Sequence, residues 1–347
     1  MRPFLLKGHE RPLTQVKFNR EGDLFISCAK NLQPCLWSSD DGRRLGTYEG
    51  HNGAIWSCDI TWDSDRLITA SADQTVRIWE LQTGKELFQF QQGEPCRSVQ
   101  LSIGEQHMAY TTDAFMGTPP MVHIYKLEQD ITQQSRTPVL EFDAPKGRIT
   151  RVMWADLNRT LITSHDYGMM RRWDVETGKM LQEACVHEDA IQDMQMSADG
   201  SHVITASLDK SAKLVDVQTF EVLKTYKTGR FVQSAAISPI FDHVLCGGGQ
   251  DASQVTTTSS KAGGFEARFF HKASSVQEPR GRMRSQGQRT SSSSSTHLLP
   301  LGWNATVLMG PKWPRTFPNS SCFVTGGEDG YVRLHHLDND YFTTRFF

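Results

Sequence analysis

Apolar and polar side chains alternate in short runs along most of the chain. In the stretch that starts at residue 50, three such runs, AIWSCDITW, RLITASA and TVRIWEL, follow one another between a Gly-His pair and a Trp that precedes an acid. Successive side chains of a strand point to opposite faces, so each run predicts a strand with one buried face. The stretch therefore predicts three consecutive strands.

The same arrangement recurs along the chain. Its end point falls at Trp37, Trp79, Tyr125, Trp173 and Val215, which gives steps of 42, 46, 48 and 42 residues. Steps of this length are typical of the four-stranded blades of a propeller. Because one small sheet cannot bury both of its faces alone, the units must stack on one another and the array must close.

The repeat predicts an all-β chain that forms one domain over 1–347, a seven-bladed WD40-type β-propeller with an irregular segment that interrupts blade 7. A strand at 3–7, which includes Phe4, Leu5 and Leu6, precedes the first Gly-His pair. We expect it to pair with the C-terminal strands, close the ring and remove an open sheet edge. The blades are expected at about 8–48, 50–90, 93–142, 146–184, 187–226, 229–272 and 322–342.

Residues 273–321 form the irregular segment. They contain five consecutive serines and several arginines, and they show little strand alternation. The composition predicts a low-complexity insert that is disordered through about residue 296. Its functional interpretation is a basic loop whose charge phosphorylation cancels; the alternative is a linker insertion, or sequence that does not belong to the blade.

Blade 2 carries a full set of polar residues for a structural network. The spacing lets His51, on the loop before the first strand, reach Ser71 on the second strand and Trp79 on the third. Asp73, in the turn between them, can accept from the imidazole. We interpret the set as structural, and a catalytic Ser/His/Asp arrangement is the alternative. Blade 1 has Ala29 at the expected hydroxyl position, so only blade 2 is expected to be complete.

Other motifs give little indication of chemistry. The seven cysteines form no C-x-x-C pair and are expected to be buried thiols. The run Gly247-Gly248-Gly249 lacks the Gly-Lys-Ser/Thr of a phosphate loop and is expected in a tight turn. Trp56, Trp62 and Trp154 fall at strand spacing and are expected in the core. We therefore expect no catalytic residue, no metal site and no cofactor.

Charge and hydropathy limit which binding partners and which cellular location the sequence predicts. The chain has 37 Lys and Arg residues against 39 Asp and Glu residues, a balance that argues against binding to nucleic acid by bulk charge. No apolar run reaches the roughly 18 residues that cross a bilayer, and the N-terminus is too polar for a secretory signal. We expect a soluble, cytoplasmic protein that neither contacts a membrane nor binds nucleic acid with direct sequence specificity.

Several longer strings resemble one family, the I subunit of eukaryotic translation initiation factor 3, whose members are seven-bladed WD-repeat proteins. The resemblance covers about 1–272 and 326–342, and between them 273–321 replaces an acidic, helical-looking stretch and a further Gly-His unit. The resemblance therefore implies that blade 7 lacks its entering strand and its Gly-His loop. We hypothesise that this segment reflects an altered reading frame or a retained intron. The strings are GHERPLTQVKFNREGDL at 8–24, RLGTYEGHNGAIW at 44–56, GGGQDASQVTTT at 247–258, FEARFFHK at 265–272 and GGEDGYVRLHHLD at 326–338.

The resemblance implies a non-catalytic scaffold subunit of the eukaryotic translation initiation factor 3 complex, which stimulates binding of mRNA and initiator methionyl-tRNA to the 40S ribosomal subunit. It also implies contacts with the B and G subunits of the factor, and with the 40S particle through the complex. The alternatives are a free-standing WD-repeat signalling or substrate-recruiting adaptor and, as a third class, an enzymatic propeller.

For the partner contact we expect a helix or strand to dock on a blade edge. We place this contact on blades 5 and 6, where the stretch DVQTFEVLKTY carries apolar side chains near a blade's outer strand. Asp216, Phe220, Leu223 and Tyr226 are the candidate contact residues, and the alternative is that they belong to ordinary core alternation.

Overall fold

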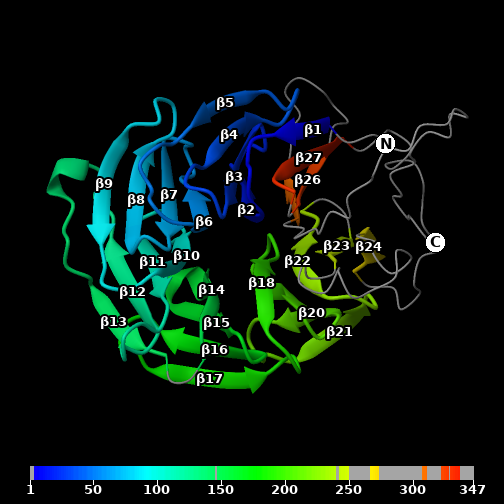
Figure 1. Cartoon of the computed structure of the whole chain (residues 1–347). Helices are drawn as coiled ribbons and strands as arrows, with labels where there is room; N and C mark the ends of the chain where they lie inside the picture. The colour runs from blue at the N-terminus through cyan, green and yellow to red at the C-terminus, as the bar shows by residue number, and fades with distance from the viewer. Residues whose placement is uncertain are drawn as a thin grey trace, which may run out of the picture.

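Seven small antiparallel sheets surround a common centre (Figure 1). The computed structural model describes residues 4–144, 147–239, 242–249, 266–272, 307–310, 322–327 and 329–336. These residues contain no α-helix, and their helical segments are two 3₁₀ turns, η1 (Ile131–Gln133) and η2 (Asp156–Asn158). None of the helical segments in these ranges has the length and apolar character of a membrane span. The predicted seven-bladed all-β propeller is confirmed.

Blades 1 to 5 each have four strands, paired in chain order from the centre to the rim. The strands of blade 1 are β2 (Leu13–Phe18), β3 (Leu24–Ala29), β4 (Cys35–Ser38) and β5 (Arg44–Thr47), and those of blade 2 are β6 (Ile55–Ile60), β7 (Arg66–Ser71), β8 (Thr75–Glu80) and β9 (Glu86–Gln91). Blade 3 has β10 (Cys96–Leu101), β11 (His107–Thr112), β12 (Met121–Lys126) and β13 (Leu140–Asp143). Blade 4 has β14 (Ile149–Ala155), β15 (Thr160–His165), β16 (Met169–Asp174) and β17 (Met180–Cys185), and blade 5 has β18 (Ile191–Met196), β19 (His202–Ser207), β20 (Ser211–Asp216) and β21 (Val222–Lys227).

Blades 6 and 7 differ from this plan. The described part of blade 6 has three strands, β22 (Val232–Ile237), β23 (His243–Gly248) and β24 (Glu266–His271). Blade 7 has the order β1-β27-β26-β25, in which β1 (Phe4–Lys7) is outermost and β25 (Val307–Gly310), β26 (Cys322–Gly326) and β27 (Tyr331–His336) make up the rest of the sheet. Blade 7 therefore combines strands from the two ends of the described chain.

The ring is closed in two ways. Its innermost strands contact one another in the order β2, β6, β10, β14, β18, β22, β25 and back to β2. In addition, β1 pairs antiparallel with β27, and Phe4 lies opposite Leu334 while Leu6 lies opposite Val332. The prediction that the N-terminal strand closes the ring is confirmed. The pairing therefore covers the backbone edge of β27, which would otherwise be open.

Strand β25 corrects the prediction for blade 7. It lies inside 273–321, pairs with β26 and takes the innermost position, so the expectation that the entering strand is missing is wrong. An unpaired β26 would expose a row of backbone donors and acceptors, and four residues at 307–310 suffice to pair them. The predicted disorder of 273–296 lies outside the described residues.

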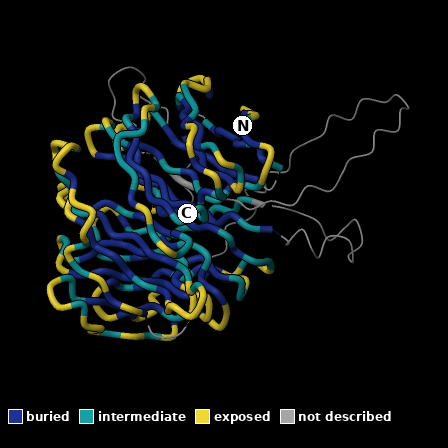
Figure 2. The backbone as a smooth tube through the Cα atoms, turned by 60° about the vertical axis from the view of Figure 1, so that its left-hand side comes forward, coloured by how far each residue is buried: buried dark blue, intermediate teal, exposed yellow. Residues whose placement is uncertain are grey.

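Buried residues lie along the strands and exposed ones gather in the turns (Figure 2), and the cores lie between neighbouring blades. Between blades 1 and 2, Ile26 and Cys28 of β3 pack with Ile55, Cys58 and Trp79 of the next sheet. Six of the seven cysteines are buried, as expected, but Cys185 is exposed on β17. Each sheet thus buries both of its faces against its neighbours. Strands β7 and β8 accordingly each contain five consecutive buried residues, so the prediction of one buried face is wrong for them.

Polar side chains of the inner strands also join the blades. Each one accepts a hydrogen bond from a backbone N–H of the next inner strand, a contact that strand alternation alone does not reveal. We call these side chains the inter-blade belt. Its bonds are Gln15 Oε1 with Cys58 N (2.8 Å), Ser57 Oγ with Val99 N (3.2 Å), Asp59 Oδ2 with Leu101 N (2.9 Å), Ser98 Oγ with Val152 N (3.2 Å), Gln100 Oε1 with Trp154 N (2.7 Å) and Gln195 Oε1 with Ile237 N (2.8 Å).

Candidate functional site

The polar network of blade 2 is present, with one change of membership. His51 Nδ1 lies 2.8 Å from Asp73 Oδ2, and His51 Nε2 lies 2.7 Å from Thr69 Oγ1. Trp79 Nε1 donates to the same Thr69 oxygen at 2.9 Å. Since the Asp73 carboxylate can only accept, the imidazole carries its proton on Nδ1, and in the neutral ring Nε2 then accepts from the Thr69 hydroxyl.

The electrostatics of the network favour an ionised Asp73. Burial by itself disfavours the charged carboxylate, but hydrogen bonds from His51 and Thr75 outweigh it and hold the pKa of Asp73 well below its usual value. Asp73 also accepts from the backbone N–H of Asn52 at 2.9 Å. The carboxylate therefore fixes both the imidazole and the loop that carries it.

Ser71 is not the bridging hydroxyl, and the prediction that placed it there is wrong. Its Oγ accepts from the backbone N–H of Asp73 at 3.2 Å, inside the turn that follows β7. Residues two apart on a strand share a face, so Thr69 and Ser71 are equivalent by alternation alone. Thr69 takes the role because Trp79, on β8, lies opposite Leu67 of β7, and from there its indole N–H reaches the Thr69 hydroxyl.

Other blades repeat the network with the same spacing. In blade 1, His9 Nε2 lies 2.6 Å from Ser27 Oγ, which also accepts from Trp37 Nε1 at 2.8 Å, and Asn31 takes the place of the acid. The expectation that Ala29 breaks this blade is therefore wrong. The hydroxyl follows its His by 18 residues in blades 1, 2 and 5, at Ser27, Thr69 and Thr205.

Blades 4 and 5 each keep part of the network. In blade 5, His187 bonds Thr205 and Asp209, each at 2.7 Å, but Val215 stands where the indole is found elsewhere. In blade 4, which lacks a Gly-His pair, Thr163 accepts from Trp173 at 2.9 Å and lies 3.0 Å from His165 Nε2. A histidine two residues along the same strand thus replaces the missing loop histidine.

This network offers no reacting atom to a substrate. Thr69 has no exposed surface, and its oxygen is bonded to both His51 and Trp79. Nucleophilic attack needs a hydroxyl that a substrate can approach, and Thr69 lacks that access. Among the described residues, no group of three or more His, Cys, Asp or Glu side chains is placed to hold a metal ion.

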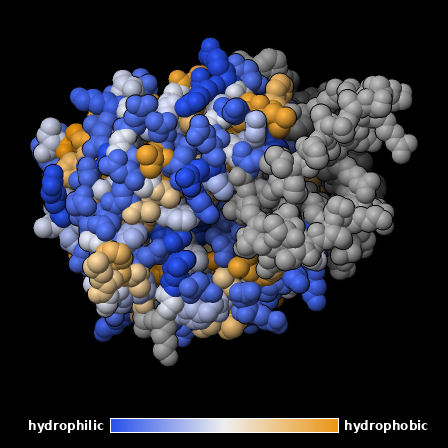
Figure 3. Space-filling model, viewed as in Figure 1, coloured by the Kyte–Doolittle hydropathy of each residue, from blue (hydrophilic) through white to orange (hydrophobic). Residues whose placement is uncertain are grey.

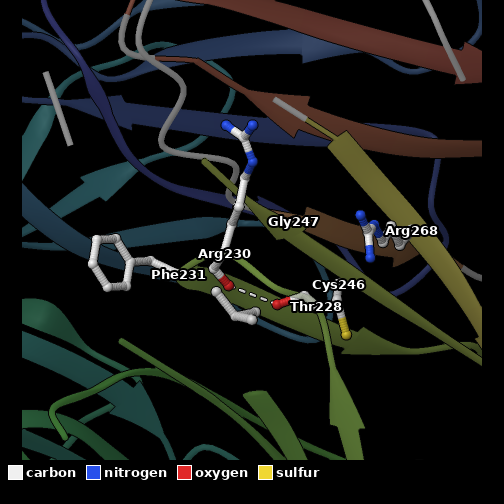
Figure 4. A pocket seen from close by; sticks show the side chains of 8 residues that line it. Thr228, Arg230, Phe231, Cys246, Gly247 and Arg268 are labelled. Atoms are coloured by element: carbon white, nitrogen blue, oxygen red, sulfur yellow. Dashed lines mark hydrogen bonds between the residues drawn. The ribbon is translucent and has the colours of Figure 1, made fainter. Parts of the chain in front are cut away.

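The glycine run and its surroundings are shown in Figure 4. Gly247 and Gly248 lie within β23, paired with Ala267 and Glu266, so the expected tight turn is wrong for these two residues. A Cβ on Gly248 would lie 2.0 Å from the Phe231 carbonyl oxygen, which explains the need for glycine. The nearby depression is lined by Thr228, Arg230, Phe231, Val232, Cys246, Gly247, Gly248 and Arg268. The guanidinium groups of its two arginines point in different directions (Figure 4).

The four candidate contact residues fall into two pairs. Phe220 and Tyr226 are buried, and Tyr226 donates from its hydroxyl to the Lys272 carbonyl oxygen at 3.1 Å. They belong to the core and cannot themselves face a partner. Leu223 is 51 % exposed on β21, beside Val222, and Asp216 is partly exposed. Asp216 Oδ1 accepts from the backbone N–H groups of residues 218 and 219, so it also shapes the turn before β21.

The tryptophan predictions were partly correct. Trp154 is buried, and Trp56 is partly buried on β6. Trp62 is 61 % exposed, so its assignment to the core is wrong. The chain leaves β6 at Ile60, two residues before Trp62, so strand spacing no longer determines which way that side chain points. Most of the face seen in Figure 3 is hydrophilic, with separate apolar spots.

Comparison with known proteins agrees with the fold and with the strings that carry the resemblance. The model of the EIF3I family matches residues 1–285. Eukaryotic translation initiation factor 3 subunit I of Bombyx mori is 41 % identical over 347 residues, which cover all of this chain and 98 % of the relative. The proteins of the same name from Drosophila pseudoobscura pseudoobscura and Drosophila melanogaster are 41 % and 40 % identical over the full length of both chains. This chain belongs to the eukaryotic translation initiation factor 3 subunit I family.

Proposed function

We propose that this chain is a non-catalytic scaffold subunit of the cytoplasmic translation initiation factor 3 complex, which stimulates binding of mRNA and initiator methionyl-tRNA to the 40S ribosomal subunit. The observation that carries the proposal is the 40–41 % identity to relatives named as subunit I over 98–100 % of their length. The closed ring supports it, because a rigid scaffold that presents loops and edges from several blades offers separate surfaces for several partners. The buried Thr69 hydroxyl is already bonded to His51 and Trp79, which supports a non-catalytic role.

The proposed partners are the B and G subunits of the factor, and the 40S particle through the complex. A nearly even balance of acidic and basic residues supports contact with the ribosome through other subunits rather than through direct, sequence-specific binding to RNA. The proposed role therefore rests on protein surfaces, and the outer strand of blade 5 is the first candidate.

The exposed residues of β21 support docking at this edge. Leu223 and Val222 present adjacent apolar side chains, and β21 pairs with β20 as the last strand of its sheet. An added helix can bury the two side chains, or an added strand can pair with the edge. Phe220 and Tyr226 lie beneath this surface and hold it in place through the core.

Titration calorimetry with the C-terminal segment of the factor's B subunit tests the contact. We expect Leu223→Lys to weaken binding by roughly tenfold or more, because a charge replaces an apolar anchor. Asp216→Asn keeps an acceptor for the turn and removes the charge, so it isolates the electrostatic part. Leu181→Lys, at an exposed apolar residue of β17, is the matched control. Equal affinities for the Leu223 and Leu181 variants, with unchanged melting, would remove β21 from the proposal.

Co-sedimentation with 40S particles tests the role itself. The scaffold proposal expects this chain to sediment with 40S particles when the other subunits of the factor are present, and to stay in solution without them. A free-standing adaptor stays in solution in both cases. Sedimentation of the chain alone contradicts the proposed contact through the complex.

A further inference from the structure

Three large apolar side chains are exposed at the same turn of three successive blades. Trp62 and Ile103 are each 61 % exposed and Leu157 is 81 % exposed. Each lies in the turn between the first and second strands of its blade, at 61–65, 102–106 and 156–159. Because the turns are equivalent in consecutive blades, they lie on one face of the ring, beside inner strands that contact one another. We call these three turns the turn platform.

The turn platform is held by hydrogen bonds between blades. The Ile103 backbone N–H donates to Asn158 Oδ1 at 2.8 Å, and Asn158 Nδ2 donates to the Ile103 carbonyl oxygen at 2.7 Å. The Trp62 backbone N–H donates to the Glu105 carboxylate. These bonds fix the three turns relative to one another before any partner arrives, which lowers the entropic cost of binding.

The backbone around Leu157 has an unfavourable conformation, although the Leu157 side chain is not part of the core. Asp156, Leu157 and Asn158 have φ of 50°, 54° and 70°, all in the left-handed region. Asn and Asp tolerate this region, whereas a leucine adopts it at a cost. Its side chain points into solvent, so burial in the core does not offset this conformational cost. Strain of this kind, combined with exposure, indicates a side chain that is presented outwards.

Acidic groups surround the turn platform. Together with the adjoining turn of blade 1 at 19–23, its turns carry six carboxylates and two guanidinium groups. The guanidinium of Arg20 lies 3.5 Å from the centre of the Trp62 ring. Burial raises the pKa of Glu105, and the charges of Asp63 and Asp59 add to this effect, while the Trp62 N–H bond and Arg66 oppose it. The carboxylates are Glu21, Asp23, Asp63, Asp65, Glu105 and Asp156, and the guanidinium groups are Arg20 and Arg159.

We propose that the turn platform is a docking surface for a basic, amphipathic segment of a partner protein. Trp62, Ile103 and Leu157 contact its apolar face, and the surrounding carboxylates attract its lysines and arginines. An exposed apolar surface with a charged rim is typical of a protein interaction site. This surface lies on blades 2 to 4 and uses other residues than the β21 contact, so it stands whether or not the β21 contact holds. Its edge meets the turn before β21, where Gln218 Nε2 donates to Asp156.

A defined probe tests the chemistry of this surface. The probe is a short peptide of Leu and Lys at helical spacing, titrated into the intact chain and compared with a Leu and Glu peptide of the same pattern and with oligouridine. We expect the Lys peptide to bind more weakly as salt is added, because the attraction is screened. We expect Trp62→Ala and Leu157→Ser each to weaken that binding roughly tenfold.

Matched variants test whether binding of the Lys peptide needs this surface in particular or only acidic groups anywhere on the protein. Leu181→Ser makes the same change at an exposed leucine on the outer strand of blade 4 and should leave the affinity unchanged. Asp63→Asn keeps the acceptor that bonds the Asp65 N–H and should reduce the salt dependence. Equal binding of the Lys and Glu peptides, or equal losses for the Leu157 and Leu181 variants, would overturn the proposal. Preferential binding of oligouridine that depends on Trp62 would also overturn it.

Discussion

The hydroxyl of Thr69 is the point at which three strands of blade 2 are fixed relative to one another. It is bonded to a histidine from the loop before β6 and to a tryptophan of β8, and it sits on β7 between them. A buried hydroxyl with two such bonds costs more to remove than its own size suggests, because its partners are left unpaired.

At this scale we predict different effects for the two hydroxyls of β7. Thr69→Val keeps the shape and should destabilise the fold by about 2–4 kcal/mol, because His51 and Trp79 each lose a buried partner. Ser71→Ala removes one acceptor at a turn and should cost about 1 kcal/mol or less. Urea unfolding of the two variants measures both values. A larger loss for the Ser71 variant would contradict the geometry of the network.

The polar network could have been predicted better from the sequence. The position 18 residues after the loop histidine is Ser27, Thr69 or Thr205, whereas the position 20 residues after it is alanine in blade 1. Aligning the blades would have selected the first position. By contrast, the burial of Phe220 and Tyr226 depends on the core that blades 4 and 6 supply to blade 5, and one blade's own alternation does not contain that information.

At the scale of secondary-structure elements, the short strand β1 contributes to the closure of the whole ring. Its four residues bury one side chain, Leu6, while Leu5 is 62 % exposed. Leu6 joins the core shared by blades 1 and 7, where it packs with residues of β26 and β27. The strand therefore supplies both hydrogen bonds and a buried anchor at the closure of the ring.

We predict that Leu6→Asp opens this closure. A charge at a buried position should cost about 3 kcal/mol or more, and the uncovered edge of β27 should promote self-association. Leu5→Asp changes the neighbouring exposed residue of the same strand and should stay within about 0.5 kcal/mol. Unfolding in urea and light scattering compare the two. Equal stability of both variants would show that β1 is not needed for closure.

Element prediction succeeded where the periodic pattern was intact and failed where its markers were lost. The alternation and the Trp spacing were enough to predict the blades and the closing strand. Strand β25 was missed because no Gly-His pair precedes it, although pairing needs only a short stretch of backbone. Trp62 was misplaced because alternation was extended past the end of β6 into a turn.

At the scale of the whole molecule, buried histidines are distributed around the ring. Burial lowers the pKa of His9 to about 4, of His165 to about 3 and of His335 to about 4. Burial also lowers the pKa of His123 and His187, although their carboxylate partners oppose the shift. Blades 1, 3, 4, 5 and 7 thus each depend on an imidazole that is neutral in the folded state.

We predict that the molecule loses stability as the pH falls from about 6.5 to about 4. In this window the unfolded chain binds protons that the folded chain excludes, so the free energy of unfolding decreases on acidification. Each excluded proton contributes up to about 1.4 kcal/mol per pH unit. Urea unfolding between these limits measures the slope, and His165→Gln should lower it. A stability that does not change across the window would contradict the prediction.

The closing pair β1 and β27 has a consequence for biosynthesis. Leu6 and Val332, which lie opposite each other, are more than 320 residues apart in the chain. At a translation rate of about 5–20 residues per second, the first strand waits for tens of seconds before its partner leaves the ribosome. During that time the nascent blades can stack in sequence, but the circle cannot be completed. A message that ends before β27 yields a product with two unprotected edges, which quality control can distinguish from a finished chain.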